Sequence, residues 1–95
     1  MTYKLKFLPA ALKEWGKLSP PIKNQFKKKL AERLKKPHLA SCKLRGYEAV
    51  YKIKLRSVGY RLAYEVIDDE LVVYVVAIGK RDKDTVYKKL ASRLD

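Results

Sequence analysis

The sequence VYKIKLRSVGYRLAYEV, residues 50–66, contains two alternating runs joined by a short turn. In the first run the cations Lys52, Lys54 and Arg56 alternate with aromatic and aliphatic residues, and the second run repeats the alternation around Arg61. Successive side chains of a strand point to opposite faces of a sheet. The stretch therefore predicts an antiparallel hairpin with one apolar face and one cationic face.

The cations of the two runs are expected to lie close together. For the apolar residues of both strands to share a face, the turn at 57–59 must place Lys54 opposite or diagonal to Arg61. Like charges across an antiparallel pair cost roughly 0.2 to 1 kcal/mol, so this arrangement weakens the fold slightly. A bound phosphate would explain it, and a plain solvent-facing sheet surface is the alternative. Mutual repulsion should also lower a lysine pKa toward the range in which a neutral amine accepts a proton.

The hairpin is part of a predicted antiparallel meander. Its strands are expected at about 48–56, 60–67 and 70–78, and they are joined by short turns. Residues 71–78 are apolar throughout, which is typical of a strand that is buried on both faces. Residues 3–7 also alternate and predict a further strand near the start of the chain.

Three helices complete the predicted fold. A first helix is expected from Pro9 to about Leu18, a second between an N-cap at Ser19 and the stop at Pro37, and a last one from about Asp84. The predicted buried residues of the first two helices are Leu8, Leu12 and Trp15, followed by Ile22, Phe26, Leu30 and Leu34.

The pattern predicts a single α+β domain over residues 1–95. In this fold a small, mostly antiparallel four-stranded sheet carries an N-terminal two-helix hairpin packed on one face, together with a C-terminal helix.

Composition restricts the function. The 95 residues include 23 Lys and Arg against 10 Asp and Glu, a net charge of +13, which favours a polyanionic partner and nucleic acid above all. One cysteine, Cys42, and one histidine, His38, are too few for a metal cluster, so no metal is expected. The longest apolar run is too short to span a bilayer and the first residues alternate, so we expect a cytoplasmic protein without a membrane partner.

Two further residues are candidates for a site. Arg81 follows the end of the apolar strand, a common place for functional side chains, and Tyr87 lies one turn into the last helix, where ordinary packing is equally expected. Cleavage of RNA by its own 2′-hydroxyl needs a base, donors for the charge on phosphate and stabilisation of the leaving oxygen. Lysine and arginine side chains can supply these functions.

The chain resembles the RelE family of bacterial toxin ribonucleases along nearly its whole length. The segments that carry the resemblance are ALKEW at 11–15, KKKL at 27–30, LRG at 44–46, the hairpin at 50–66, IGKR at 78–81 and VY at 86–87. The resemblance implies a microbial-ribonuclease-like fold and an enzyme that cuts messenger RNA in the ribosomal A site without a cofactor. It also implies products with a 2′,3′-cyclic phosphate and a 5′-hydroxyl.

Carried over by position, the resemblance assigns roles to single residues. Lys52 and Lys54 match the catalytic lysines, Arg61 the phosphate-stabilising arginine, Arg81 the leaving-group residue and Tyr87 the catalytic tyrosine. Which lysine takes the proton stays open. The basic residues expected to bind RNA or the ribosome are Lys43, Arg45, Arg56, Lys80, Lys27 and Lys28, of which the last two can equally belong to a solvated helix face.

The resemblance further implies an acidic RelB-type antitoxin as a partner, ribosomal RNA contacts, and binding of operator DNA through the toxin–antitoxin complex. Two alternatives remain open from the residues. One is a non-catalytic RNA- or DNA-binding module in which the cations only hold phosphates, and the other is a structural protein associated with the ribosome.

Overall fold

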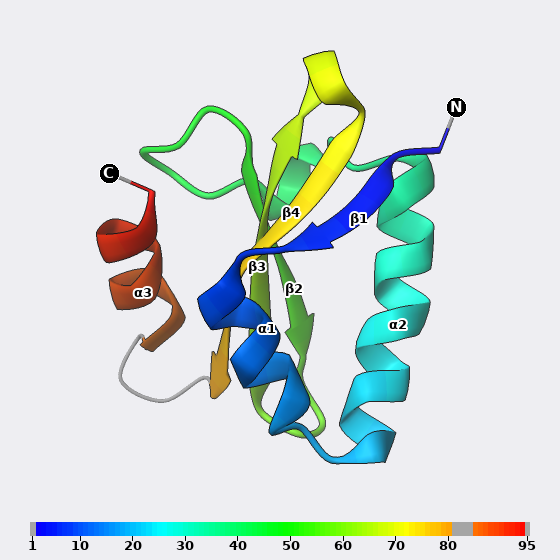
Figure 1. The fold of residues 1–95 in the computed structure, drawn as a ribbon, viewed down its shortest axis with the longest axis vertical. Helices are drawn as coiled ribbons and strands as arrows, with labels where there is room; N and C mark the ends of the chain where they lie inside the picture. The colour runs from blue at the N-terminus through cyan, green and yellow to red at the C-terminus, as the bar shows by residue number, and fades with distance from the viewer. Residues whose placement is uncertain (1, 81–84, 95) are drawn as a thin grey trace.

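The computed structural model describes residues 2–80 and 85–94. Within them the chain forms four strands and three α-helices, drawn in Figure 1. In chain order these are β1 (Lys4–Phe7), α1 (Pro9–Gly16), α2 (Pro20–Lys35), β2 (Val50–Leu55), β3 (Tyr60–Ile67), β4 (Val72–Lys80) and α3 (Thr85–Arg93). Short 3-10 turns lie at Ala40–Cys42 and Asp68–Glu70.

The four strands form one sheet in the order β1-β4-β3-β2. The β2, β3 and β4 strands are antiparallel neighbours, and β1 pairs with β4 in parallel. The predicted α+β fold with a mostly antiparallel sheet is therefore confirmed. The outermost strand on one side, β2, carries the first run of alternating cations.

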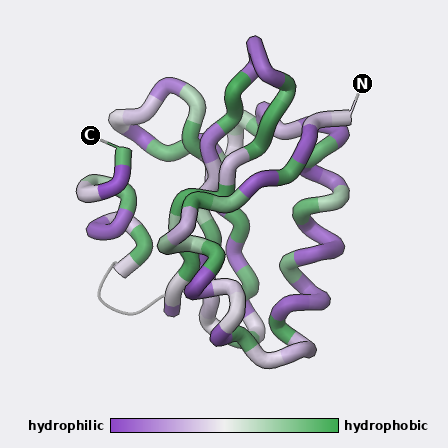
Figure 2. The backbone as a smooth tube through the Cα atoms, in the orientation of Figure 1, coloured by the Kyte–Doolittle hydropathy of each residue, from purple (hydrophilic) through white to green (hydrophobic). Residues whose placement is uncertain are grey.

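Helices cover both faces of the sheet. The α1 and α2 helices cover one face, where Phe26 and Leu30 are almost fully buried against the sheet. The α3 helix covers the other face through Val86 and Leu90. Figure 2 shows hydrophobic residues concentrated in the central strands and alternating with hydrophilic ones along α2. The central strand β4 is buried on both faces, as its apolar sequence predicts.

The cationic hairpin has the predicted register. Lys54 lies directly opposite Arg61, and the turn between the strands closes with Gly59 at φ +69°. Glycine suits this position because it has no Cβ to clash in the left-handed region. A register shift between Ala63 and Tyr64 lets two successive residues of β4 face α3, which keeps that side of the sheet filled.

Some local expectations were wrong. Leu12 is 54% exposed, whereas the neighbouring Ala11 occupies the buried position of α1. The two residues lie about 100° apart on the helix, and the smaller one faces β4. Ser19 is the N-cap residue of α2, but its hydroxyl makes no capping hydrogen bond. The last strand begins at Val72 because the preceding 3-10 turn ends in Leu71 at φ 54°.

No helix in the described part of the chain is long and apolar enough to cross a membrane.

Candidate active site

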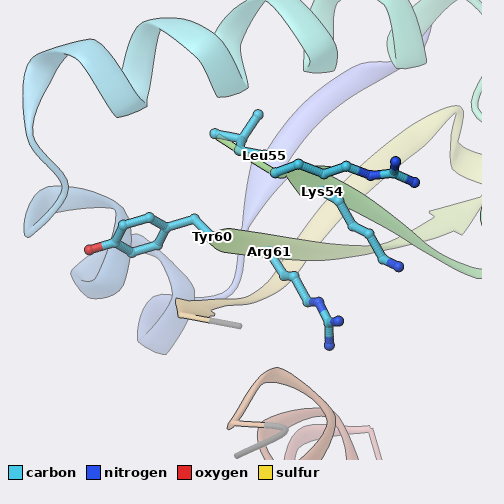
Figure 3. Close-up of a pocket in the computed structure, with 5 residues that line it drawn as sticks. Lys54, Leu55, Tyr60 and Arg61 are labelled. Carbon is cyan, nitrogen blue, oxygen red and sulfur yellow. The ribbon is translucent and has the colours of Figure 1, made fainter. Parts of the chain in front are cut away.

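The cations of the hairpin lie on the sheet face that α3 covers. Lys54 lies opposite Arg61 across the β2–β3 pair, and Lys52 lies opposite Ala63, a buried residue in the core beneath α3. In Figure 3, Lys54 and Arg61 point toward α3, while Leu55 and Tyr60 point toward the helices on the other face. The alternation of the sequence thus places the positive charges together on one side of a rigid pair of strands.

A cavity of about 370 Å³ lies at the turn end of this pair. Its lining consists of Lys54, Leu55, Arg56, Tyr60 and Arg61, the five residues drawn in Figure 3. Three of these five side chains are cations, and none is acidic. The cavity therefore favours an anionic ligand such as a phosphate group.

Neighbouring charges alter the protonation of Lys54. The pKa of Lys54 is lowered, first because the charge of Lys52 lies close by, and further by desolvation and by the charges of Arg61 and Arg56. This direction confirms the prediction that the cluster lowers a lysine pKa. A larger fraction of neutral amine is therefore available at Lys54 to accept a proton.

Arg61 also contacts the α3 helix. Its guanidinium carbon lies 5.4 Å from the centre of the Tyr87 ring, within the range of a cation–π contact. Its Nε is buried and has no hydrogen-bond partner in the described structure. A buried N–H group without an acceptor is costly, so the fold by itself leaves the hydrogen-bonding capacity of Arg61 partly unsatisfied.

The segment that carries Lys43 and Arg45 runs beside β2, where Lys43 forms an isolated antiparallel bridge with Tyr51. It is held next to β2 by a hydrogen bond from the Leu44 backbone N–H to the Val50 carbonyl oxygen, 2.9 Å long, and Leu44 packs in the core beneath α3. Gly46, at φ +85°, turns the chain between these two basic residues and β2. Both cations are exposed, and they line a cavity of about 290 Å³.

The other predicted site residues fall into three groups. Lys80 is exposed at the end of β4, where it lies opposite Tyr60, a lining residue of the first cavity. Arg81 lies outside the described residues. Lys27 and Lys28 are exposed on α2, which covers the opposite face of the sheet, so the structure does not bring them to the cationic cluster.

Sequence patterns did not reveal Arg33. Only 8% of this residue is exposed, and it is the one charged residue that is buried in the described part of the chain. It lies between Leu30 and Leu34 on the side of α2 that faces the sheet, and its Nη1 donates to the carbonyl oxygen of Lys52 at 3.3 Å. A cation within an apolar helical stripe was the signal in the sequence. Within residues 2–80 and 85–94, no three side chains that bind metals come together.

Comparison with known proteins agrees with this fold. Residues 5–85 match the family described as the ParE toxin of type II toxin–antitoxin systems, parDE. The chain is 50% identical over 94 residues to the mRNA interferase toxin RelE of Escherichia coli K12 and to the mRNA interferase RelE of Shigella flexneri, with 99% of each chain covered.

The solved structures give the same result. A mutant of E. coli toxin RelE in which two arginines are replaced by alanine, solved in the free state, matches with a TM-score of 0.92 at 48% identity, over 100% of both chains. The toxin in the intact E. coli RelBE toxin–antitoxin complex matches with a TM-score of 0.82 at 52% identity, covering 85% of this chain and 99% of that one. The fold and the site therefore define a small basic toxin of a type II toxin–antitoxin system. The chain belongs to the ParE/RelE toxin family and is of the RelE type.

Proposed function

We propose that this toxin cleaves messenger RNA in the ribosomal A site by attack of a 2′-hydroxyl on the adjacent phosphate. The observation that carries the proposal is the convergence of Lys52, Lys54, Arg61 and Tyr87 on one sheet face, beside a cavity lined by cations. The relatives named mRNA interferases, at 50% identity over almost the whole chain, support the same reaction.

Each side chain has a separate role in the proposed reaction. Lys54 accepts the proton of the 2′-hydroxyl, because its pKa is lowered and its neutral form is more accessible than that of an isolated lysine. Lys52 maintains this shift through its charge, and Arg61 donates from its guanidinium to the oxygens of the pentavalent phosphorane. The products are a 2′,3′-cyclic phosphate and a 5′-hydroxyl, and no metal or other cofactor takes part.

Two residues complete the proposed site. Arg81 stabilises or protonates the leaving 5′-oxygen. Tyr87 positions Arg61 through the cation–π contact and stacks on or orients the RNA. Because the site lacks a histidine to act as an easy base, the ribosome supplies the bend and position of the substrate. Purified toxin is therefore expected to cut naked RNA poorly. Basic residues outside the centre, among them Arg45 and Lys80, contact ribosomal or messenger RNA.

We further propose an acidic RelB-type antitoxin as the partner of this chain. The net charge of +13 favours an acidic partner, because complementary charge steers association. E. coli RelE has been solved together with its antitoxin RelB. The complex is expected to bind its operator DNA, and the toxin acts in the cytoplasm. Co-expression with an acidic open reading frame adjacent to the gene should abolish toxicity, and unchanged toxicity would exclude that pairing.

The reaction is tested by induced expression in a bacterium, followed by primer extension on an abundant message. Cuts should appear at codons occupied by ribosomes and translation should stop. Efficient cleavage of naked RNA at physiological salt would contradict the ribosome-dependent mechanism. Binding without any cleavage would instead favour a nucleic-acid-binding module.

A further inference from the structure

A second cationic cavity lies beside β2, next to the first. Its volume is about 380 Å³, and it is lined by Arg33, Ser41, Cys42, Lys52, Lys54 and Arg56. No acidic side chain belongs to this lining. Lys54 and Arg56 line both cavities, so the two cavities adjoin across the same pair of side chains.

Arg33 places a fixed positive charge at this cavity. Its Nη1 donates to the Tyr64 hydroxyl at 2.9 Å, and its Nη2 donates to the Cys42 sulfur at 3.4 Å. In the described structure no carboxylate lies within ion-pair distance of Arg33. Buried charged side chains in proteins are usually paired with an opposite charge.

The hydroxyl beside Arg33 does not supply the missing negative charge. Burial raises the pKa of Tyr64, and its hydroxyl donates to the Pro37 carbonyl oxygen at 2.9 Å, so the phenol stays neutral. An arginine stays protonated in proteins and carries five N–H donors. The cavity therefore has a permanent excess of positive charge and unused capacity to bind an anion.

We propose that this cavity is a second phosphate subsite, which holds the phosphodiester next to the one that is cleaved. The inference rests on the proposed function, because the first cavity is taken as the place of the reacting phosphate. Two anions at close, regular spacing are what one strand of RNA presents, and the two cavities share Lys54 and Arg56. A single carboxylate of a protein partner would need only one of the two cavities.

The subsite also has a mechanical consequence for the reaction. Arg33 contacts the backbone of β2 at Lys52, so a phosphate bound there fixes the RNA relative to the strand that carries both lysines. Holding two successive phosphates defines the direction of the RNA strand through the site. Positioning of this kind contributes to catalysis by orienting the 2′-hydroxyl for attack.

The test uses Ser41, because replacing Arg33 would also remove its hydrogen bonds to Tyr64 and to β2. Ser41 is exposed, so Ser41→Asp introduces a negative charge into the cavity, and Ser41→Asn is the uncharged control of the same size. Affinity is measured on ribosomes programmed with a message that carries a 2′-deoxynucleotide at the cut position, which removes the attacking hydroxyl. In matched messages one neighbouring phosphate at a time is replaced by an uncharged methylphosphonate.

The subsite predicts a specific coupling between protein and RNA. Ser41→Asp should weaken binding about tenfold, the loss expected for one charge-assisted contact, while Ser41→Asn binds as the wild type does. Neutralising one phosphate adjacent to the cut should weaken the wild type by a similar factor but have no further effect on Ser41→Asp.

Three results would overturn the subsite. In the first, the effects of Ser41→Asp and of neutralising a phosphate are additive at both neighbouring phosphates. In the second, the two changes are coupled only at the phosphate of the cut linkage. In the third, Ser41→Asp weakens binding of the antitoxin but not of the ribosome, which would assign the cavity to a protein partner. Cleavage of an unmodified message by the wild type on the same ribosomes is measured in parallel. If the wild type cleaves and no coupling is found, only the subsite fails, whereas the absence of cleavage would refute the proposed function.

Discussion

Replacing Glu14 by glutamine should destabilise the protein by loosening the attachment of α3. Glu14 lies on α1, and its carboxylate accepts from Arg93 Nη1 and Nη2 at 2.9 and 3.1 Å and from the Ile78 backbone N–H at 3.1 Å. It also forms an ion pair with Lys89. One carboxylate thus connects α1 to β4 and to two residues of α3.

The magnitude follows from burial and from the number of contacts. The side chains of Glu14, Lys89 and Arg93 are 18%, 27% and 20% exposed, so water screens these interactions only in part. A hydrogen bond to a charged group contributes about 1.5 to 3 kcal/mol, and glutamine retains one acceptor oxygen. We expect Glu14→Gln to lower the free energy of unfolding by about 2 kcal/mol, and Tm by about 10 °C.

Urea denaturation of the two proteins, with Glu32→Gln as the control, measures this loss. Glu32 is an exposed carboxylate on α2, and its replacement should change stability by less than about 0.5 kcal/mol. Because α3 carries Tyr87, cleavage by Glu14→Gln should also decline as temperature rises, before that of the control. Stability of Glu14→Gln within about 0.5 kcal/mol of the wild type would refute the reasoning.

The same substitution has a distinct pH dependence. Burial acts to raise the pKa of Glu14, but Arg93, Lys89 and the Ile78 N–H outweigh it, so the pKa lies below its ordinary value of 4.5. A carboxyl group with a lowered pKa stabilises the fold above its unfolded pKa, and this contribution is lost as the pH falls through the folded pKa. The stability difference between wild type and Glu14→Gln should therefore be constant near pH 7 and shrink below about pH 4.5.

Four further results are expected. Lys54→Ala and Arg81→Ala should each lose about two to three orders of magnitude in single-turnover cleavage on programmed ribosomes, with a much smaller loss of ribosome affinity. Cleavage at the wild-type rate would refute the site assignment. Loss of affinity in proportion to loss of cleavage would show that both residues only anchor phosphates. Lys52→Ala should move the rising limb of the pH–rate profile to higher pH, because the charge that lowers the pKa of Lys54 is gone, and an unmoved limb would exclude Lys54 as the base. Gly59→Ala should cost about 1 kcal/mol in urea denaturation, because the turn requires φ +69°, and an unchanged midpoint would contradict that requirement. Affinity for RNA should fall with salt with a slope of about −0.7 per phosphate contact, and a flat dependence would rule out the basic surface as the binding site.

The local pattern of the sequence was sufficient for much of the fold. The alternation around Lys54 and Arg61 predicted both the hairpin and the face that the cations occupy. Side chains of a strand alternate between two faces, so the cations must lie on the face opposite the apolar residues. The apolar run of residues 71–78 likewise predicted the buried central strand. The approach of Arg61 to Tyr87 was suggested only by resemblance, since it depends on how α3 returns to the sheet.

Other features depend on contacts that no local pattern contains. Adjacent apolar residues of a short helix compete for the same buried position, so Ala11 could not be distinguished from Leu12. The partners of Glu14 lie in β4 and α3, far along the chain from α1. Arg33 was missed because a buried cation is rare and its acceptors come from β2 and β3.

The parallel pairing of β1 with β4 has a consequence for synthesis of the toxin. Lys4 aligns with Val72, so the strand that is translated first must wait for the strand that is translated last. Contacts between residues so distant in sequence form slowly, because a long loop must close before they are gained. The β2–β3 hairpin can pair as soon as it leaves the ribosome, but the sheet stays open on its other side until residue 80 has emerged. The sheet therefore cannot be completed before β4 has left the ribosome, and any product that stops short of β4 leaves β1 without the partner that completes the fold.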